Sequence, residues 1–184
     1  MAAVLRGLTA ALAPLVLVVA GTAAVLRMAD WAPAVLGGEP RGVRRYMSIE
    51  EAERATRARV RLPAFFPDTL GWPPARVRLA VGRPASLAVV VAGRAGSMAH
   101  LVVAQTLGAR GPISPLLLGP GVTLQSAAIE VAGRAATLTR LSLAGGALVH
   151  QVTWDSVDRT VSVRFDGPLD QLLRMADSLE RTTR

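Results

Sequence analysis

Residues 147–165 read ALVHQVTWDSVDRTVSVRF, and this stretch decides the class of fold. In its second half, apolar and polar side chains alternate in the order Val161, Ser162, Val163, Arg164 and Phe165. This period of two is typical of a strand that buries one face and exposes the other. Only the short segment 156–159 separates it from the preceding β-type run. Parallel strands need a connection of a dozen or more residues, so the two runs are expected to pair antiparallel.

The same kind of pattern extends over residues 75–166. Glycine-containing turns separate several short β-type runs, and we expect a single antiparallel sheet of five to seven strands from them. The runs are 76–81, 85–92, 98–107, 122–132, 135–143, 147–155 and 160–165.

One helix is predicted before the sheet in the sequence, and one after it. Ser48 and Glu51 have the spacing of a capping box, which predicts a short helix over about 48–58. Pro168 suits the first turn of a second helix, and the apolar residues of 169–179 recur at helical spacing. We expect this closing helix to pack on the sheet, so the predicted class is α+β.

The insert Gly108–Gly121 contains three prolines and cannot be a central strand. It also contains three adjacent leucines, Leu116, Leu117 and Leu118. Each leucine left in water would forgo roughly 1.5–3 kcal/mol of burial free energy. We therefore expect the sheet, a partner protein or the bilayer surface to cover them. The insert is predicted to be a flap over the sheet that borders a ligand or partner site.

The start of the chain predicts a membrane anchor. Residues Gly7–Leu26 contain no charged side chain, and about twenty apolar residues are enough to cross the ~30 Å hydrocarbon core as a helix. The predicted organisation is an anchor over 1–27 with its transmembrane helix at about 7–26, a linker over 28–45 and a folded domain over 46–184. The alternative is a signal peptide cleaved near Ala23, which would release a secreted domain.

The arginines that follow the anchor bear on its orientation and on lipid contact. Arg27, Arg41, Arg44 and Arg45 by themselves favour a cytoplasmic C-terminal domain, although long domains translocate largely regardless of charge. Each basic residue close to an anionic lipid surface gains about 1 kcal/mol. Arg41, Arg44 and Arg45 are therefore candidate contacts with anionic lipid, and the alternative is ordinary solvated charge.

The composition argues against several classes of function. The net charge of +8 is carried by scattered arginines, and aromatic residues make up only 4% of the chain, too few for the stacking platforms of single-strand nucleic-acid binders. We therefore expect no nucleic-acid partner. The absence of cysteine excludes disulfides, thiolate metal sites and a cysteine nucleophile.

The search for catalytic or metal-binding residues predicts neither an enzyme nor a cofactor. His100 and His150 each lie in a β-type run, and a zinc site needs at least a third protein ligand. Asp155, Asp158 and Asp166 are interpreted as turn residues. A hydrolase that uses one of the histidines remains as an alternative.

Several short motifs resemble those of a bacterial domain family of unknown function. The motifs are SIEEAERAT at 48–56, VRLPAFFPDTLGW at 60–72, LVHQVTWDS at 148–156 and LDQLLRMADSL at 169–179, so the resemblance spans about 46–182. The family occurs in membrane-tethered extracytoplasmic proteins, some of which resemble anti-sigma factors or lipoproteins. Only six residues precede Gly7, so this chain resembles an isolated sensor half and not a complete anti-sigma factor.

The resemblance implies that the C-terminal domain lies outside the cytoplasm. The predicted function is then that of a non-catalytic binding or sensing module at the cell membrane, with a role in envelope signalling. Its expected partners are the lipid bilayer, through the N-terminal helix, and an unidentified membrane or envelope protein. A structural or assembly subunit of a membrane complex is the competing class.

Overall fold

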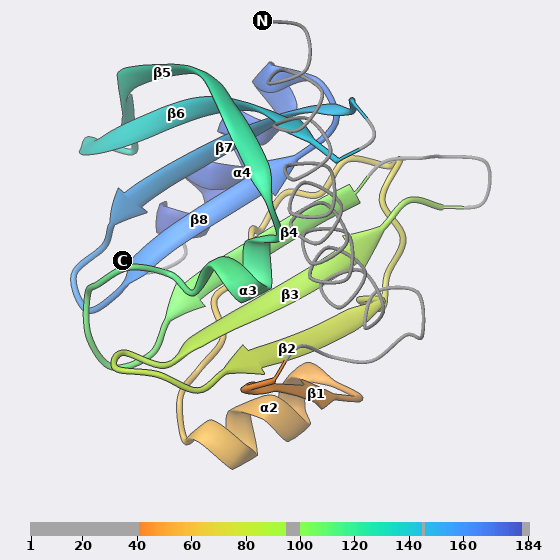
Figure 1. Ribbon diagram of the computed structural model, residues 1–184, viewed down its shortest axis with the longest axis vertical. Helices are drawn as coiled ribbons and strands as arrows, with labels where there is room; N and C mark the ends of the chain where they lie inside the picture. The colour runs from red at the N-terminus through yellow and green to blue at the C-terminus, as the bar shows by residue number, and fades with distance from the viewer. Residues whose placement is uncertain (1–40, 95–99, 145, 182–184) are drawn as a thin grey trace, which may run out of the picture. The chain divides into compact units, whose positions relative to one another are not determined.

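The computed structural model of the chain describes residues 41–94, 100–144 and 146–181, and Figure 1 shows their arrangement. The described residues form one antiparallel sheet with the strand order β1-β2-β3-β4-β8-β7-β6-β5 and three helices, so the predicted α+β class is confirmed. The strands are β1 Val43–Tyr46, β2 Arg76–Ala80, β3 Ser86–Ala92, β4 His100–Thr106, β5 Gly121–Val131, β6 Arg134–Leu143, β7 Leu148–Asp155 and β8 Thr160–Phe165. The helices are α2 Ile49–Thr56, α3 Pro115–Leu118 and α4 Leu169–Arg181.

The predicted number of five to seven strands was too low, because the sheet has eight. Strands β2 to β8 coincide with the seven β-type runs of the sequence. The additional strand, β1, lies largely in the segment expected to be a linker over 28–45. Its sequence VRRY has two adjacent arginines and no alternation, and it pairs only at the sheet edge, with Val43 opposite Ala80. Such a short edge strand has no periodic signal in the sequence.

Helix α2 begins at the predicted cap. The Ser48 hydroxyl accepts a hydrogen bond from the Glu51 backbone N–H at 3.2 Å. The Glu51 carboxylate accepts from the Met47 N–H at 2.8 Å, one residue before the cap nitrogen expected for a capping box. The helix ends at Thr56, short of the predicted residue 58, because Arg57 adopts a left-handed conformation with φ of 53°.

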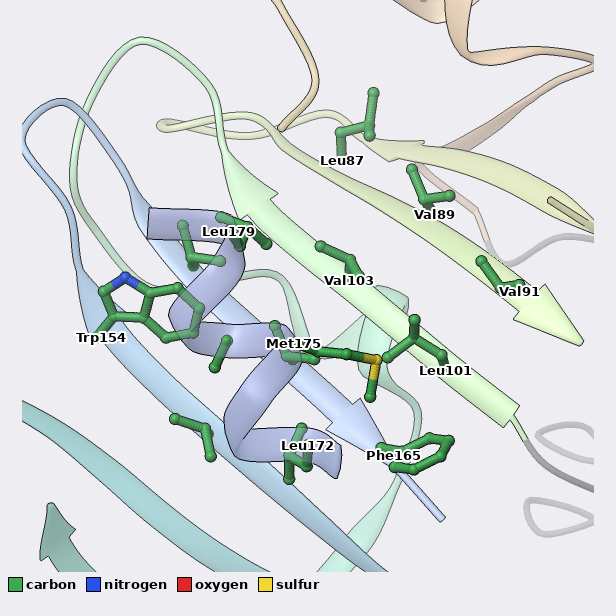
Figure 2. Close-up of a cluster of buried hydrophobic side chains, with 14 of the residues drawn as sticks. Leu87, Val89, Val91, Leu101, Val103, Trp154, Phe165, Leu172, Met175 and Leu179 are labelled. Atoms are coloured by element: carbon green, nitrogen blue, oxygen red, sulfur yellow. The ribbon is translucent and has the colours of Figure 1, made fainter. Parts of the chain in front are cut away.

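The main core lies between one face of the sheet and helix α4. Figure 2 shows Leu172, Met175 and Leu179 of α4 directed at the apolar side chains of the central strands. All three are fully buried, and Trp154 and Phe165 pack in the same cluster. The prediction of a closing helix packed on the sheet is therefore confirmed.

The insert that contains the three leucines covers the opposite face of the sheet. Leu117, on α3, is fully buried against the small residues Ala80, Ala88 and Ala104 of β2, β3 and β4. Leu118 is half-buried, and Leu116 is 43% exposed. The insert thus covers this face of the sheet, and Leu117 is the most deeply buried of its three leucines.

The predicted anchor over 1–27, with its transmembrane helix at 7–26, lies outside the described residues, as does the linker up to residue 40. Within the part of the chain that the structure describes, no helix is both long and apolar enough to cross a bilayer.

Candidate functional site

A surface hollow of about 230 Å³ lies beside Trp72, where the end of β3 meets the chain between α2 and β2. Its lining combines apolar, aromatic and charged side chains. The lining residues are Phe66, Pro67, Asp68, Leu70, Gly71, Trp72, Val91 and Arg94. Small-ligand sites combine an apolar lining with a few polar groups, as this hollow does, but most of them are larger.

Backbone hydrogen bonds hold the two sides of the hollow together. The Gly71 N–H donates to the Ala92 carbonyl at 2.9 Å, and the Arg94 N–H donates to the Thr69 carbonyl at 2.9 Å. Leu70 forms an isolated antiparallel bridge with Gly93 between them. The segment before Trp72 is thereby fixed to the end of β3.

The floor of the hollow is apolar and its aromatic wall is partly open to water. Leu70 and Val91 are buried beneath it. The rings of Phe66 and Trp72 lie with centroids 5.8 Å apart and planes inclined by 56°, the tilted arrangement that aromatic pairs favour. Trp72 is still 59% exposed. Its indole therefore has apolar area that a ligand can cover.

Two exposed groups of opposite charge complete the lining. Arg94 donates from Nε to the Leu70 carbonyl at 3.1 Å, which fixes the plane of its guanidinium. Asp68 is exposed. A guanidinium held in this way presents a donor fork that matches the geometry of a carboxylate or phosphate. The hollow can thus bind a ring-shaped or aliphatic group that carries an anionic substituent.

The structure does not place the predicted leucine site beside this hollow. Val91 faces the α4 side of the sheet, because its partner Leu101 belongs to the main core. Leu117 packs on the other face, so the hollow and the leucine flap are separated by the sheet. Of the three leucines, Leu116 is the most exposed, at 43%.

Two of the predicted lipid-contact arginines, Arg44 and Arg45, lie on the edge strand β1. Arg41, Arg44 and Arg45 are all exposed. Arg44 pairs with Leu79 and Arg45 pairs with Arg78, so these two neighbours leave the sheet on opposite faces. Both side chains are available to solvent, but on different faces of the sheet.

The two histidines do not meet. His150 pairs with Phe165, which pairs with Leu101, so these three side chains share one face of the sheet. His100 precedes Leu101 and therefore leaves the opposite face. Its backbone N–H donates to the Asp166 carboxylate at 2.6 Å, and its Nδ1 lies 3.6 Å from the same group. Among the described residues, no group of three or more histidine, cysteine or acidic side chains is arranged to hold a metal ion.

The buried ionic groups elsewhere belong to the framework of the fold. The Glu180 carboxylate of α4 accepts hydrogen bonds from Trp154 Nε1 at 3.2 Å, the Ser156 hydroxyl at 3.2 Å and Arg134 Nε at 2.5 Å. Burial alone would raise the pKa of Glu180, but these three donors and the Arg134 charge outweigh it, and the pKa is lowered. The carboxylate therefore ties α4 to strands β6 and β7.

A second network closes the β7–β8 hairpin. Arg159 donates to the Gln105 side chain at 2.7 Å and to the Arg59 carbonyl at 2.9 Å. It also pairs with Asp158 at 2.8 Å, and this hydrogen bond is the main reason that the pKa of Asp158 is lowered. Asp155 accepts from the Thr160 hydroxyl at 2.6 Å. Asp158 lies in the turn, as the sequence predicted, whereas Asp155 is the last residue of β7 and pairs with Thr160.

Sequence reasoning missed Phe66, Trp72 and Arg94 as members of a site. In the sequence, Trp72 is the last residue of the motif at 60–72, and Arg94 falls between the β-type runs 85–92 and 98–107. The available signal was a large aromatic residue placed between the turn at 68–71 and two prolines, Pro73 and Pro74. A tryptophan in such an irregular segment has no strand or helix periodicity that would bury it.

Comparison with protein families, with curated proteins and with solved structures found no match for this chain. The resemblance to the family of membrane-tethered extracytoplasmic domains therefore stays a prediction.

Proposed function

We propose that this protein is a membrane-anchored, extracytoplasmic binding or sensing module without catalytic activity, and that the Trp72 hollow is its ligand site. The observation that supports this most directly is the combination found in one hollow: a half-open indole, a buried apolar floor and an oriented guanidinium. The apolar groups supply the binding free energy, and the charged group selects the ligand.

The ligand class follows from the lining. A ring or short aliphatic group can lie against Trp72 and cover Leu70 and Val91, which leaves its substituent at the rim. Arg94 then pairs with a carboxylate or phosphate on that substituent. Asp68 can accept a hydrogen bond from a hydroxyl or ammonium group of the same ligand. We infer a small ring-containing acid, or the end of a peptide with the same chemistry.

Binding can be tested with phenylacetate and its neutral analogue phenylacetamide as probes, followed by tryptophan fluorescence of the full 184-residue chain. We expect both probes to change the fluorescence of the wild type and neither to change that of Trp72→Phe. Arg94→Ala is expected to weaken phenylacetate binding about tenfold, since a charge-assisted hydrogen bond is lost, and to leave phenylacetamide unaffected. Arg140→Ala is the matched control, because Arg140 is also exposed but lies outside the hollow.

Two results would count against this ligand site. If Arg94→Ala and Arg140→Ala weakened phenylacetate binding equally, the overall positive charge of the protein, and not the hollow, would attract the anion. A fluorescence change that persists in Trp72→Phe would place the ligand elsewhere.

The orientation across the membrane has its own experiment. The chain lacks cysteine, so Thr137→Cys, at an exposed position of β6, would be the single target of a membrane-impermeant maleimide. Labelling in intact cells is expected for an extracytoplasmic domain. Labelling only after lysis would contradict the proposed orientation.

The exposed Arg41, Arg44 and Arg45 support contact with an anionic lipid surface, each by about 1 kcal/mol if they reach it. Replacing all three with glutamine should reduce binding of the chain to vesicles that contain anionic lipid. Unchanged vesicle binding would remove these arginines from the proposal.

A further inference from the structure

The two edges of the sheet differ in how they are protected against pairing with another chain. Edge strands present unpaired backbone N–H and C=O groups, and proteins usually guard them with short length, charge or proline. Strand β1, at one edge, has four residues, two of which are exposed arginines. Strand β5, at the other edge, has eleven residues and carries a single charge, Glu130. Figure 1 shows these strands at opposite ends of the sheet.

Strand β5 is also exposed along almost its whole length. Residues 121–128 are all exposed, and Val122 and Leu124 are 67% and 55% exposed. Its sequence GVTLQSAAIEV contains no proline, lysine or arginine. A bulge separates Thr123 from Gln125 in the pairing with β6, which leaves Gln125–Val131 as a regular segment. This segment has an open outer edge among the described residues.

We propose that β5 pairs with the β5 strand of a second copy of this chain, antiparallel and about a two-fold axis, so that two sheets become continuous. This inference is independent of the ligand site at Trp72. The two edges explain why the assembly would stop at two copies. A head-to-tail arrangement would pair β5 of one copy with β1 of the next and would form an open-ended assembly. The exposed charges of Arg44 and Arg45 on β1 oppose that pairing.

The low charge of β5 makes this edge the part of the sheet where two copies can meet with least repulsion. The chain carries a net charge of +8, so two copies repel each other overall, and a contact between them is least unfavourable where the surface has little positive charge. Strand β5 has no basic residue. If the axis passes through Ala128, Glu130 lies opposite Ser126 of the second copy, and the two carboxylates do not face each other. The small side chains at 126–128 also let the two strands approach closely.

The absence of cysteine allows a direct test by cross-linking the full 184-residue chain. Residues that face each other across a two-fold antiparallel pair have Cα atoms about 4.5–5.5 Å apart, which is within the range for a disulfide. Under mild oxidation we expect Ala128→Cys to form a covalent dimer. Arg45→Cys, on the guarded edge, is the matched control and should remain monomeric.

A second pair of variants measures the contact without cross-linking. Ala128→Arg would place like charges next to each other at the axis and should weaken dimerisation by at least about tenfold, measured by native mass spectrometry over a dilution series. Ala135→Arg adds the same charge at an exposed site on β6, one strand in from the edge and opposite Glu130, and should leave the dimer intact.

The outcomes separate the alternatives. A wild-type chain that stays monomeric throughout the dilution series overturns the proposal. Equal weakening by Ala128→Arg and Ala135→Arg overturns the β5 edge as the contact. If Ala128→Cys forms a disulfide with a different protein in cells and no homodimer is found, the proposal of a second copy is wrong. The occupant of the β5 edge is then an extended segment of another protein.

Discussion

The leucine flap offers a sharp test of how the insert is held on the sheet. Leu117 is fully buried against Ala80, Ala88 and Ala104, whereas its neighbour Leu116 is 43% exposed. Buried Leu→Ala replacements cost about 2–5 kcal/mol, and the cost is lower where the surroundings can collapse into the cavity. Helix α3 has only four residues and is followed by Gly119, so it can settle toward the sheet. We therefore expect Leu117→Ala to lower the free energy of unfolding by about 2–3 kcal/mol.

This loss should be measurable as a change in melting temperature. A domain of this size loses about 2–4 °C for each kcal/mol, so Leu117→Ala should lower the Tm by about 4–12 °C. The Leu117 carbonyl accepts a hydrogen bond from Arg78 at 2.8 Å, and this backbone contact survives in the variant. The loss therefore reports on the side chain. Thermal unfolding of the full chain, followed by the near-ultraviolet circular dichroism of the buried Trp154, is a suitable assay.

Leu116→Ala is the matched control because it removes the same atoms from an exposed site. We expect a change of less than about 0.5 kcal/mol for it. If both variants melted at the wild-type temperature, the insert would not be held by burial of Leu117. If both lost the same amount, the distinction between the two leucines would be wrong.

Three further predictions concern the framework. Ser48→Ala should lower the free energy of unfolding by about 1 kcal/mol, whereas Ser48→Asp, which can still cap α2, should not. Gly167→Ala should cost about 1–3 kcal/mol in denaturant titrations, because an added methyl group would collide with the buried ring of Phe165; a neutral result would show that this ring moves freely. Because the pKa of Glu180 is lowered in the folded state, its contribution to stability is complete above the ordinary glutamate pKa and is lost as the pH falls through the lowered value. The Tm of Glu180→Gln should therefore fall less with acid than that of the wild type, and parallel curves would refute this role.

Strand positions could be predicted closely where the pattern is local. Strands β2 to β8 lie in short apolar or alternating runs, and helix α4 has apolar residues at helical spacing, so each can be recognised within its own segment. Strand β1 could not, because four residues with two adjacent arginines have no period, and its pairing with β2 depends on the rest of the sheet. The same holds for α3, whose helix is one turn long and begins at Pro115.

The candidate site could not be predicted, for a related reason. Trp72 and Arg94 come from different segments, and the bridge between Leu70 and Gly93 brings them to one hollow. That bridge depends on where β3 ends, and no motif in either segment encodes it. The leucine insert shows the intermediate case: hydrophobicity required that Leu116–Leu118 be covered, but the geometry of the sheet selected Leu117.

The sequence by itself determined the antiparallel sheet, the closing helix and a charge-free N-terminal segment, because hydrophobic periodicity and the absence of charge are properties of neighbouring residues. Only the tertiary structure decided the strand order, in which β8 lies beside β4 and leaves β5 and β1 as edges. It also decided which aromatic residue remains exposed, because Trp72 is 59% open to solvent. Strand order and exposure depend on contacts between residues far apart in the chain, and a local pattern carries no information about which of those contacts form.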